Sequence, residues 1–317
     1  MSTLFVDRKD LTLSFEGQCI ALYEQGHKRG TVPLHLLERV VIHGQVNLDT
    51  RLLGALADKN IGVVMLSGRN HRCVAMLLGK PHNDSQRRVA QYACYLHQEQ
   101  RERLSRWLVI AKLRSQKKLL SLALSQRPDL RNQLSSSVSS LIGILSQLQA
   151  SNEFSVEQLR GFEGSGAASY FKAFTLLFAP SLKFTSRQRR PPPDPVNACL
   201  SLGYTLLHFD AVKACHEAGL DPYIGFFHDP AFGRESLACD VIELLRARLD
   251  EFIWRLFRER ALRVENFTDE KGKVLLNKTG RQRFYAEYEV FAKIHRRLLR
   301  RYGYALGQYF IKYYAKI

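Results

Sequence analysis

The stretch GLDPYIGFFHDPAFGRESLACDVIELLRARLDEF, residues 219–252, shows how the second part of the chain is organised. GLDPY has the composition of a turn, and IGFF is an apolar run that we expect to be buried. His228 follows at the start of the loop HDPAFGRE. Ser236 is then placed as the N-cap of a long helix. The core stripe of that helix is Leu237, Val241, Leu244, Leu245, Phe252 and Leu256. The pattern therefore puts a histidine-bearing loop directly before a helix.

Helical periodicity extends from Ser85 almost to the end of the chain, with short interruptions. RQRRPPPDP (187–195) cannot be helical, because its prolines lack the backbone donor that a helix interior needs. It ends with Asp194 as an N-cap and a proline at the first helical position. We expect the next helix to stop at the C-cap glycine Gly219. The serine-rich QLSSSVSS (133–140) is predicted to be a loop.

Short apolar or alternating runs, separated by turn signals, fill the first 80 residues. The expected strands are TLFV, LTLSF, CIALYE, VVIHG, IGVVMLSG and HRCVAMLL. IGVVMLSG (61–68) is continuous enough to be buried on both faces. LDTRLLGALADKN has helical spacing, with Thr50 or Asp49 as its cap. The predicted fold class is α+β: a small N-terminal β-rich domain (1–80) followed by a larger all-helical domain (81–317).

The charge of the chain points to a polyanionic partner. The 317 residues include 47 Lys and Arg against 30 Asp and Glu, a net charge of +17. Residues 1–84 hold 10 basic and 8 acidic side chains, which leaves 37 and 22 for residues 85–317. We therefore expect the second part to contact the polyanion.

Cysteine usage and hydropathy indicate a cytoplasmic, soluble protein. The six cysteines form no CxxC pair and lie mostly in apolar stretches, as small core residues do in a reducing compartment. The start of the sequence does not resemble a signal peptide, and no apolar run approaches the ~18 residues that a membrane span needs.

Two carboxylates near the start of the 236–252 helix form a candidate metal site with the loop histidine. Asp240 and Glu243 are three residues apart, so they are neighbours on one flank of the helix. Together with His228 they would suit Mg²⁺ or Mn²⁺. The alternative is that the acids only favour the helix N-terminus electrostatically and that His228 bonds to backbone.

Two helices carry a basic face. One has Arg103, Arg106, Arg114, Lys117 and Lys118, and the other has Lys293, Arg296, Arg297, Arg300 and Arg301. Either face could simply be solvated, which is the usual fate of a charge run. Two such faces with almost no acids, in the strongly basic part of the chain, favour phosphate contacts. We predict contacts to phosphate groups from Arg187, Arg189, Arg190, Arg296, Arg297, Arg300 and Arg301.

Several segments, in order and spacing, resemble the CRISPR-associated spacer-acquisition integrases, the "Cas one" family. They are GFEGSGAASYF (161–171), RRPPPDPVNACLSLGYTLL (189–207), GLDPYIGFFH (219–228), GRESLACDVIE (233–243) and NKTGRQRFYAEYE (277–289). The resemblance implies that Glu163, His228 and Glu243 are the metal ligands, and that Asp240 is a nearby supporting acid. Many relatives have an acid-rich stretch and a proline after the helix acids. LLRARLD (244–250) stands here instead, so we expect the helix to run straighter.

The same resemblance implies a function: a metal-dependent DNA endonuclease and integrase of CRISPR adaptation, which joins the 3′-hydroxyl ends of captured DNA to the CRISPR repeat. It also implies a homodimer, to which the N-terminal domain contributes, and a small ferredoxin-like adaptation partner. Two alternatives stay open. One is a related metal nuclease or transposon-type integrase outside a CRISPR locus, and the other is a DNA-binding scaffold without catalysis.

Overall fold

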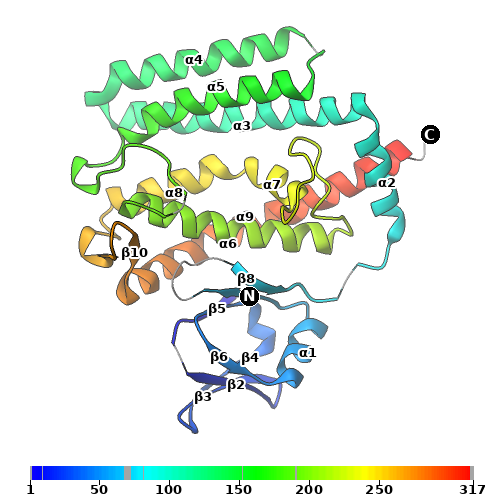
Figure 1. Cartoon of the computed structure of the whole chain (residues 1–317), viewed down its shortest axis with the longest axis vertical. Coiled ribbons are helices and arrows are strands. Elements are labelled where there is room, and N and C mark those ends of the chain that lie inside the picture. The colour runs from blue at the N-terminus through cyan, green and yellow to red at the C-terminus, as the bar shows by residue number, and fades with distance from the viewer. Residues whose placement is uncertain are drawn as a thin grey trace. The chain divides into compact units, whose positions relative to one another are not determined.

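The fold class is confirmed by a computed structural model, in which a strand-rich N-terminal region precedes a helical one (Figure 1). The structure describes residues 2–8, 10–67, 73–80, 82–151, 153–189 and 191–314. The chain divides into two compact units. The first comprises Met1–Asn83 and Tyr285–Lys293, and the second comprises Asp84–Phe284 and Ile294–Ile317.

The described residues of the first unit form two four-stranded sheets, a helix between strands, and a segment of a later helix. One sheet has the order β1-β5-β7-β8, with β1, β5 and β7 parallel and β8 antiparallel to β7. The other has the order β4-β3-β2-β6, with only the β2–β6 pair parallel. Their bounds are β1 Ser2–Val6, β2 Leu11–Glu16, β3 Cys19–Glu24, β4 His27–Pro33, β5 Leu37–His43, β6 Val46–Leu48, β7 Gly62–Leu66 and β8 Cys73–Leu77, with a 3₁₀ turn at Leu34–Leu36.

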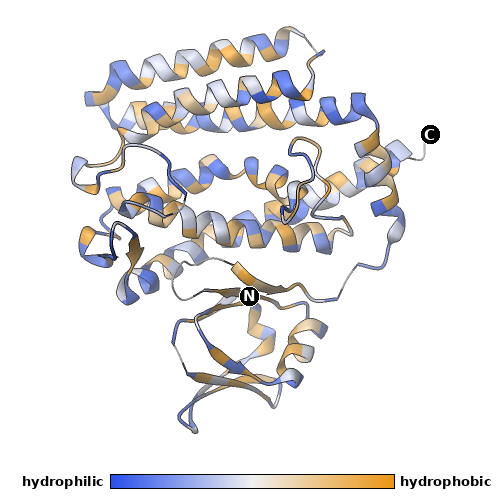
Figure 2. Cartoon of the chain, viewed as in Figure 1, coloured by the Kyte–Doolittle hydropathy of each residue, from blue (hydrophilic) through white to orange (hydrophobic). Residues whose placement is uncertain are grey.

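One apolar core serves both sheets, and it takes residues from strands and from the helix α1 (Thr50–Asp58). Figure 2 shows apolar residues concentrated on the strands of this unit. β7 is buried almost throughout, as its continuous apolar run predicts. Of the two candidate caps of α1, Asp49 is the one used, and it accepts a hydrogen bond from Arg51 N at 2.9 Å. Strand β4 was not predicted, because it is an exposed edge strand with polar residues at most positions.

A segment far along the sequence, Tyr285–Lys293 of helix α9 (Lys278–Tyr314), belongs to the first unit. Phe5 of β1 stacks on Tyr285, with ring centroids 4.2 Å apart. Thr3 Oγ1 donates a 2.6 Å hydrogen bond to Glu289 Oε2. The first unit is therefore not contiguous in sequence.

The second unit is a set of packed helices (Figure 1). α3, α4 and α5 pack on one another, α6 packs on α7 and α8, and α3 also contacts α7 and α8. The bounds are α2 Ser85–Leu96, α3 Gln98–Gln126, α4 Arg131–Ala150, α5 Val156–Thr175, α6 Pro195–Glu217, α7 Ser236–Glu243, α8 Arg246–Arg258 and α9 Lys278–Tyr314, with 3₁₀ turns at Pro128–Leu130, Pro180–Leu182 and Val264–Asn266.

Helix α6 begins and ends where its caps predict. Asp194 is the N-cap and accepts from Asn197 N at 2.8 Å, with a proline at the first helical position. Gly219 follows the helix with φ +76°, the left-handed conformation that favours glycine. The structure therefore confirms this part of the sequence interpretation.

Three predictions about the second unit are wrong. QLSSSVSS (133–140) is not a loop but lies inside α4, because tertiary packing on Leu134, Ser137 and Leu141 overrides a weak local preference. The unit is helical as predicted, apart from a short antiparallel hairpin of β9 (Phe267–Asp269) and β10 (Val274–Leu276).

The other two errors concern the helix after the loop histidine, which does not run straight. It breaks immediately after Glu243, where Leu244 and Leu245 form a turn between α7 and α8. Ser236 is also not its cap: its hydroxyl donates to Asp229 O at 2.9 Å, and Glu235 occupies the cap position. Neither glycine nor proline marks this break, so local sequence could not reveal it.

No helix in the described part of the chain combines the length and apolarity that crossing a membrane would require.

Candidate functional site

His228 is held in one orientation by Asp240. The Asp240 carboxylate is fully buried and accepts four hydrogen bonds across the loop before α7. Its Oδ2 accepts from Phe226 N (2.6 Å) and Phe227 N (3.1 Å), and its Oδ1 accepts from His228 N (3.0 Å) and His228 Nδ1 (2.7 Å). Because an ionised carboxylate only accepts, Nδ1 donates in this contact, and Nε2 is the ring nitrogen left to bind a metal when the imidazole is neutral. This is the arrangement that orients a metal-binding imidazole.

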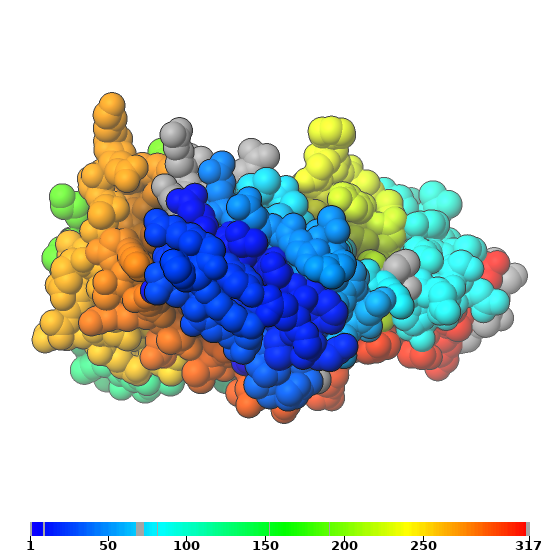
Figure 3. Space-filling model, turned by 90° about the horizontal axis from the view of Figure 1, so that it is seen from below, coloured from blue at the N-terminus to red at the C-terminus, as the bar shows by residue number. Residues whose placement is uncertain are grey.

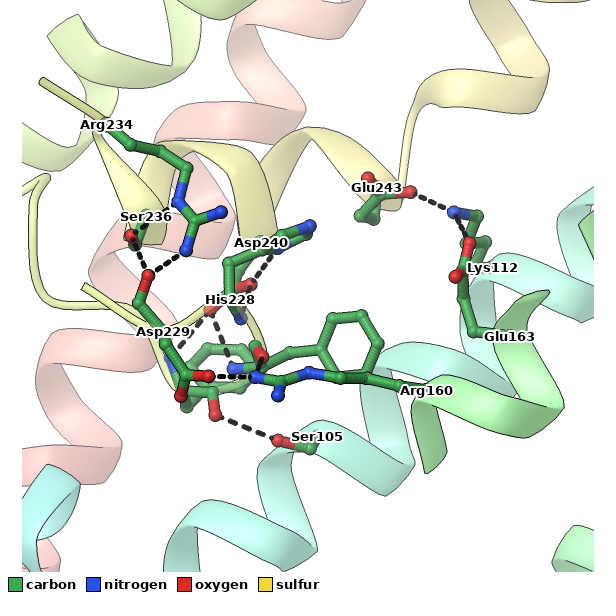
Figure 4. A network of polar contacts seen from close by, with 12 residues as sticks. Ser105, Lys112, Arg160, Glu163, His228, Asp229, Arg234, Ser236, Asp240 and Glu243 are labelled. Atoms are coloured by element: carbon green, nitrogen blue, oxygen red, sulfur yellow. Dashed lines mark hydrogen bonds and ion pairs between the residues drawn. The ribbon is translucent and has the colours of Figure 1, made fainter. Parts of the chain in front are cut away.

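The residue after His228 ties the same loop to α3 and α5 (Figure 4). Asp229 pairs with Arg101 of α3 and, at 2.5 Å, with Arg160 of α5. Arg160 also donates to Phe227 O at 2.9 Å. Burial acts to raise the pKa of Asp229, but the Arg160 and Arg101 guanidinium groups outweigh it and hold that pKa below its ordinary value. Asp240 thus holds His228 directly, and Asp229 holds the backbone next to it against α3 and α5.

Glu163 lies on α5, one turn beyond Arg160. The helix starts at a capping box, in which Ser155 Oγ accepts from Gln158 N (3.2 Å) and Gln158 Oε1 accepts from Ser155 N (2.9 Å). Gly166 lets α5 approach α3 closely, because a Cβ at that position would lie 2.3 Å from Leu113 Cδ2. This close contact brings Glu163 beside Lys112, the neighbour of Leu113.

Lys112 joins Glu163 to Glu243 (Figure 4). Its ammonium group donates a hydrogen bond to Glu163 Oε1 and lies 2.6 Å from Glu243 Oε2. The second contact is close, but it lacks hydrogen-bond geometry. Among the described residues, no donor therefore makes a hydrogen bond to the buried Oε2 of Glu243. Two of the predicted metal ligands therefore converge on one buried lysine.

Glu243 is ionised in this setting. Burial alone would raise its pKa, but the nearby charges of Arg246 and Lys112 outweigh burial and lower the pKa to about 2. Arg246 Nε donates to Glu243 Oε1 at 2.6 Å. This pair spans the break, since Glu243 is the last residue of α7 and Arg246 is the first of α8.

A second buried acid supports Arg246. The guanidinium of Arg246 lies over the Tyr204 ring, 4.8 Å from its centroid. Tyr204 in turn donates to Asp250 Oδ1 at 2.5 Å, and Tyr170 donates to Asp250 Oδ2 at 2.8 Å. This chain of contacts leads from Glu243 into the core between α5, α6 and α8 and fixes the orientation of Arg246.

The donor set fits a hard divalent cation in kind. Glu163 and Glu243 offer carboxylate oxygens, one of them a buried oxygen without a directed donor, and His228 offers Nε2. In this conformation, however, no three His, Cys, Asp or Glu side chains among the described residues form a metal-binding group. The carboxylates close on Lys112, and His228 lies on the Asp240 side of the site (Figure 4).

The predicted DNA-binding arginines differ in exposure. Arg189, Arg297 and Arg301 are exposed and Arg300 is half-buried, whereas Arg190 lies outside the described residues. Arg187 is half-buried and donates to Gln188 O (2.6 Å) and Asn197 Oδ1 (2.9 Å).

Arg296 requires a correction. It is only 5% exposed and lies 3.7 Å from Asp210, so it belongs to the packing between α9 and α6 and is not on the exposed basic face. The exposed stripe of α9 passes through Lys293, Arg297 and Arg301 instead.

Sequence reasoning did not find Lys112, Arg246, Asp229 or Arg160. Lys112 did carry a signal, because it lies on the buried stripe of α3 with Leu108, Val109, Gln116 and Leu119. A lysine at a core position needs a buried acid as its partner. The other three residues carried no comparable local signal.

The loop that follows His228 projects from the surface (yellow in Figure 3). At its tip Phe232 is fully exposed, and the turn is closed by a bridge between Ala231 and Arg234. The segment next to the candidate ligands is therefore accessible to a large partner.

Known proteins similar to this chain support the sequence interpretation. The family model described as "CRISPR associated protein Cas1" matches residues 4–290. A protein from Thermodesulfovibrio yellowstonii, named CRISPR-associated endonuclease Cas1 1, is 39% identical over 302 residues, covering 95% of this chain and 94% of that protein.

Two solved structures have the same fold. TM1797, a Cas1 protein from Thermotoga maritima, has a TM-score of 0.84 at 23% identity and covers 98% of this chain and 97% of its own. A casposase bound to integration product has a TM-score of 0.82 at 19% identity, covering 97% of this chain and 91% of its own. The family resemblance is confirmed over nearly the full length: the chain belongs to the Cas1 family of CRISPR-associated proteins.

Proposed function

We propose that this chain is a metal-dependent DNA endonuclease and integrase of CRISPR adaptation, which joins the 3′-hydroxyl ends of captured DNA to the CRISPR repeat by transesterification. The observation that carries the proposal is the meeting of Glu163 and Glu243 at one buried cation, beside an imidazole whose Nδ1 is held by Asp240. Three segments distant in sequence supply these groups. The endonuclease name of the 39% identical relative supports the same activity.

The residues proposed to hold Mg²⁺ or Mn²⁺ are Glu163, His228 and Glu243. When bound, the ion neutralises charge on the scissile phosphate and activates the attacking oxygen. The protein orients the ligands: Asp240 presents Nε2 of His228, and Arg246 positions the Glu243 carboxylate. In the joining step the 3′-oxygen of the captured strand bonds to phosphorus while the repeat strand's own 3′-oxygen leaves. The number of phosphodiester bonds stays the same, so no external energy source is needed.

The assay that tests the proposal uses a plasmid bearing a CRISPR repeat and short duplexes with labelled 3′-hydroxyl ends. With Mg²⁺ or Mn²⁺, and with the small adaptation partner added, we expect label to appear in the plasmid at the repeat ends. A chelator should prevent this. If the protein binds both DNAs but never joins or nicks them with any divalent metal, it is the non-catalytic scaffold instead.

The similarity to a casposase structure favours one second candidate, a transposon-type integrase. The same assay separates the two. Efficient joining at many plasmid positions, with no preference for the repeat and no response to the partner, would favour that alternative. The proposed assembly is a homodimer, to which the N-terminal unit contributes, that binds double-stranded DNA and a small ferredoxin-like partner.

Asp240→Asn is expected to lower the joining rate about 10–100-fold, the usual loss when a residue that orients a metal ligand is changed. The amide cannot accept at all four of the hydrogen bonds that the Asp240 carboxylate receives, so it frees the His228 ring to rotate. Single-turnover joining measures the effect, and Asp129→Asn at an exposed carboxylate is the control. A wild-type rate would remove Asp240 from the orientation of His228.

Arg297→Glu together with Arg301→Glu is expected to weaken duplex binding and to reduce the slope of log affinity against log salt by about two, one unit for each lost phosphate contact. Both side chains lie on the exposed stripe of α9. Fluorescence anisotropy at several salt concentrations measures the slope. Arg51→Glu, a 79% exposed side chain in the N-terminal unit, is the matched control. Equal slopes for the double variant and wild type would exclude this stripe from the DNA path.

A further inference from the structure

Lys112 occupies the centre of the proposed metal site, although it is not one of the proposed ligands. It is 8% exposed and lies on the buried stripe of α3, where an uncompensated ammonium group would be strongly unfavourable. Its partners are the carboxylates of Glu163 and Glu243. The lysine is therefore a counter-charge for both acids.

The two carboxylates depend on this lysine to different degrees. Glu243 has a second cation in Arg246, at 2.6 Å from its other oxygen. For Glu163, the only cation shown in contact within the described chain is Lys112. Without a positive charge between them, the two acids would repel each other in a poorly solvated place.

A metal ion and the ammonium group compete for the same space. The ammonium nitrogen lies 2.6 Å from Glu243 Oε2 and donates to Glu163 Oε1. A Mg²⁺ ion held by these two carboxylates would need its oxygen ligands at about 2.0–2.1 Å. Both cations cannot bind these oxygens at once, because the volume is the same and their charges repel.

We propose that Lys112 is the resident cation of the metal-free site, and that a divalent ion binds Glu163 and Glu243 only after displacing the Lys112 ammonium group. The inference rests on the proposed metal site. Lysine suits the role, because its single charged group is carried on a flexible four-carbon stem that can move without a change in the helix. Lys112 holds the two carboxylates together before the ion arrives, and it opposes binding of the ion.

The test is Lys112→Met, which keeps the length and apolar packing of the side chain and removes its charge. Mn²⁺ is titrated into wild type and variant by calorimetry, without DNA, and thermal unfolding is followed with and without the ion. Lys118→Met, an exposed lysine on the same helix, is the matched control. We expect Lys112→Met to bind Mn²⁺ at least about tenfold more tightly than wild type and to unfold at a lower temperature without metal. Mn²⁺ should then raise the unfolding temperature of the variant by more than it raises that of wild type.

The outcomes separate the two proposals. Equal or weaker Mn²⁺ binding by Lys112→Met, with normal binding by wild type, overturns the displacement and leaves the metal site intact. Absence of Mn²⁺ binding in both proteins, or binding that survives Glu163→Gln unchanged, overturns the metal site itself.

A measurement on the unchanged protein covers the case in which Lys112→Met does not fold. Lysines of wild type are acetylated with a water-soluble ester, and each site is quantified by mass spectrometry. Mn²⁺ should raise the labelling of Lys112 several-fold, because the displaced ammonium group loses its acid partners and moves towards solvent, while Lys118 stays constant. Labelling of Lys112 that is unaffected by a saturating Mn²⁺ concentration contradicts the proposal.

Discussion

Glu163→Gln is expected to abolish strand joining and nicking, with a loss larger than the roughly 100-fold upper end seen for residues that only orient a metal ligand. The amide keeps the shape of the side chain and removes its negative charge. It therefore removes one of two proposed carboxylate ligands and one of the two acids beside Lys112. Folding should be nearly unaffected, because the side chain is part-exposed and Glu243 still compensates Lys112.

DNA affinity provides the internal comparison for this variant. We expect duplex binding to stay within about twofold of wild type, because affinity rests on basic side chains contacting phosphates. Glu157→Gln is the matched control: it removes a carboxylate from the same helix, but that side chain is 78% exposed. Strand joining by Glu157→Gln should be normal. Wild-type joining rates in purified Glu163→Gln would exclude Glu163 as a ligand and end the proposed mechanism.

Gly225→Ala is expected to destabilise the helical unit by about 3 kcal/mol, the upper end of the usual range for overpacking a core, and to reduce joining severely. A Cβ at this position would lie 2.7 Å from Asp240 Oδ2 and 2.7 Å from the backbone carbon of Ser236. The backbone of α7 cannot give way as the tip of a flexible side chain can. The methyl group must therefore push the loop away from Asp240, and with it His228.

Urea unfolding measures the stability of Gly225→Ala, and the joining assay measures its activity. Gly143→Ala is the control, because this exposed glycine of α4 has no atom within 4 Å of a Cβ among the described residues. Alanine is favoured over glycine in a helix by about 1 kcal/mol, so the control should be slightly stabilised. Unchanged stability of Gly225→Ala would mean that the loop does not pack on α7 as the structure describes.

The fold was predictable wherever local signals agreed. Helix α6 begins at Asp194 and ends before Gly219 because a cap, a proline and a glycine mark its ends. The strands of the N-terminal unit were visible when they carried apolar runs, and edge strand β4 was missed because its residues are mostly exposed and polar. Residues 133–140 were misread because serines in a helix signal a loop only weakly, and packing decided otherwise.

For the candidate site, the sequence by itself determined which residues to examine. Glu163, His228 and Glu243 were identified through segments that resemble one family, and their chemical kind suits a divalent cation. Sequence also determined the strong basic character of the second part, because charge is a property of composition alone.

Only the tertiary structure decided how those groups meet. Lys112 and Glu163 are neighbours because α5 approaches α3 at Gly166, and Glu243 meets Arg246 where α7 breaks from α8. Arg296 is likewise buried beside Asp210 and is not part of the exposed basic face. Periodicity along one chain shows which side of a helix is apolar, but not which helix covers that side or how closely. The choice between a solvated charge and a buried, paired one was therefore made by packing between segments distant in sequence.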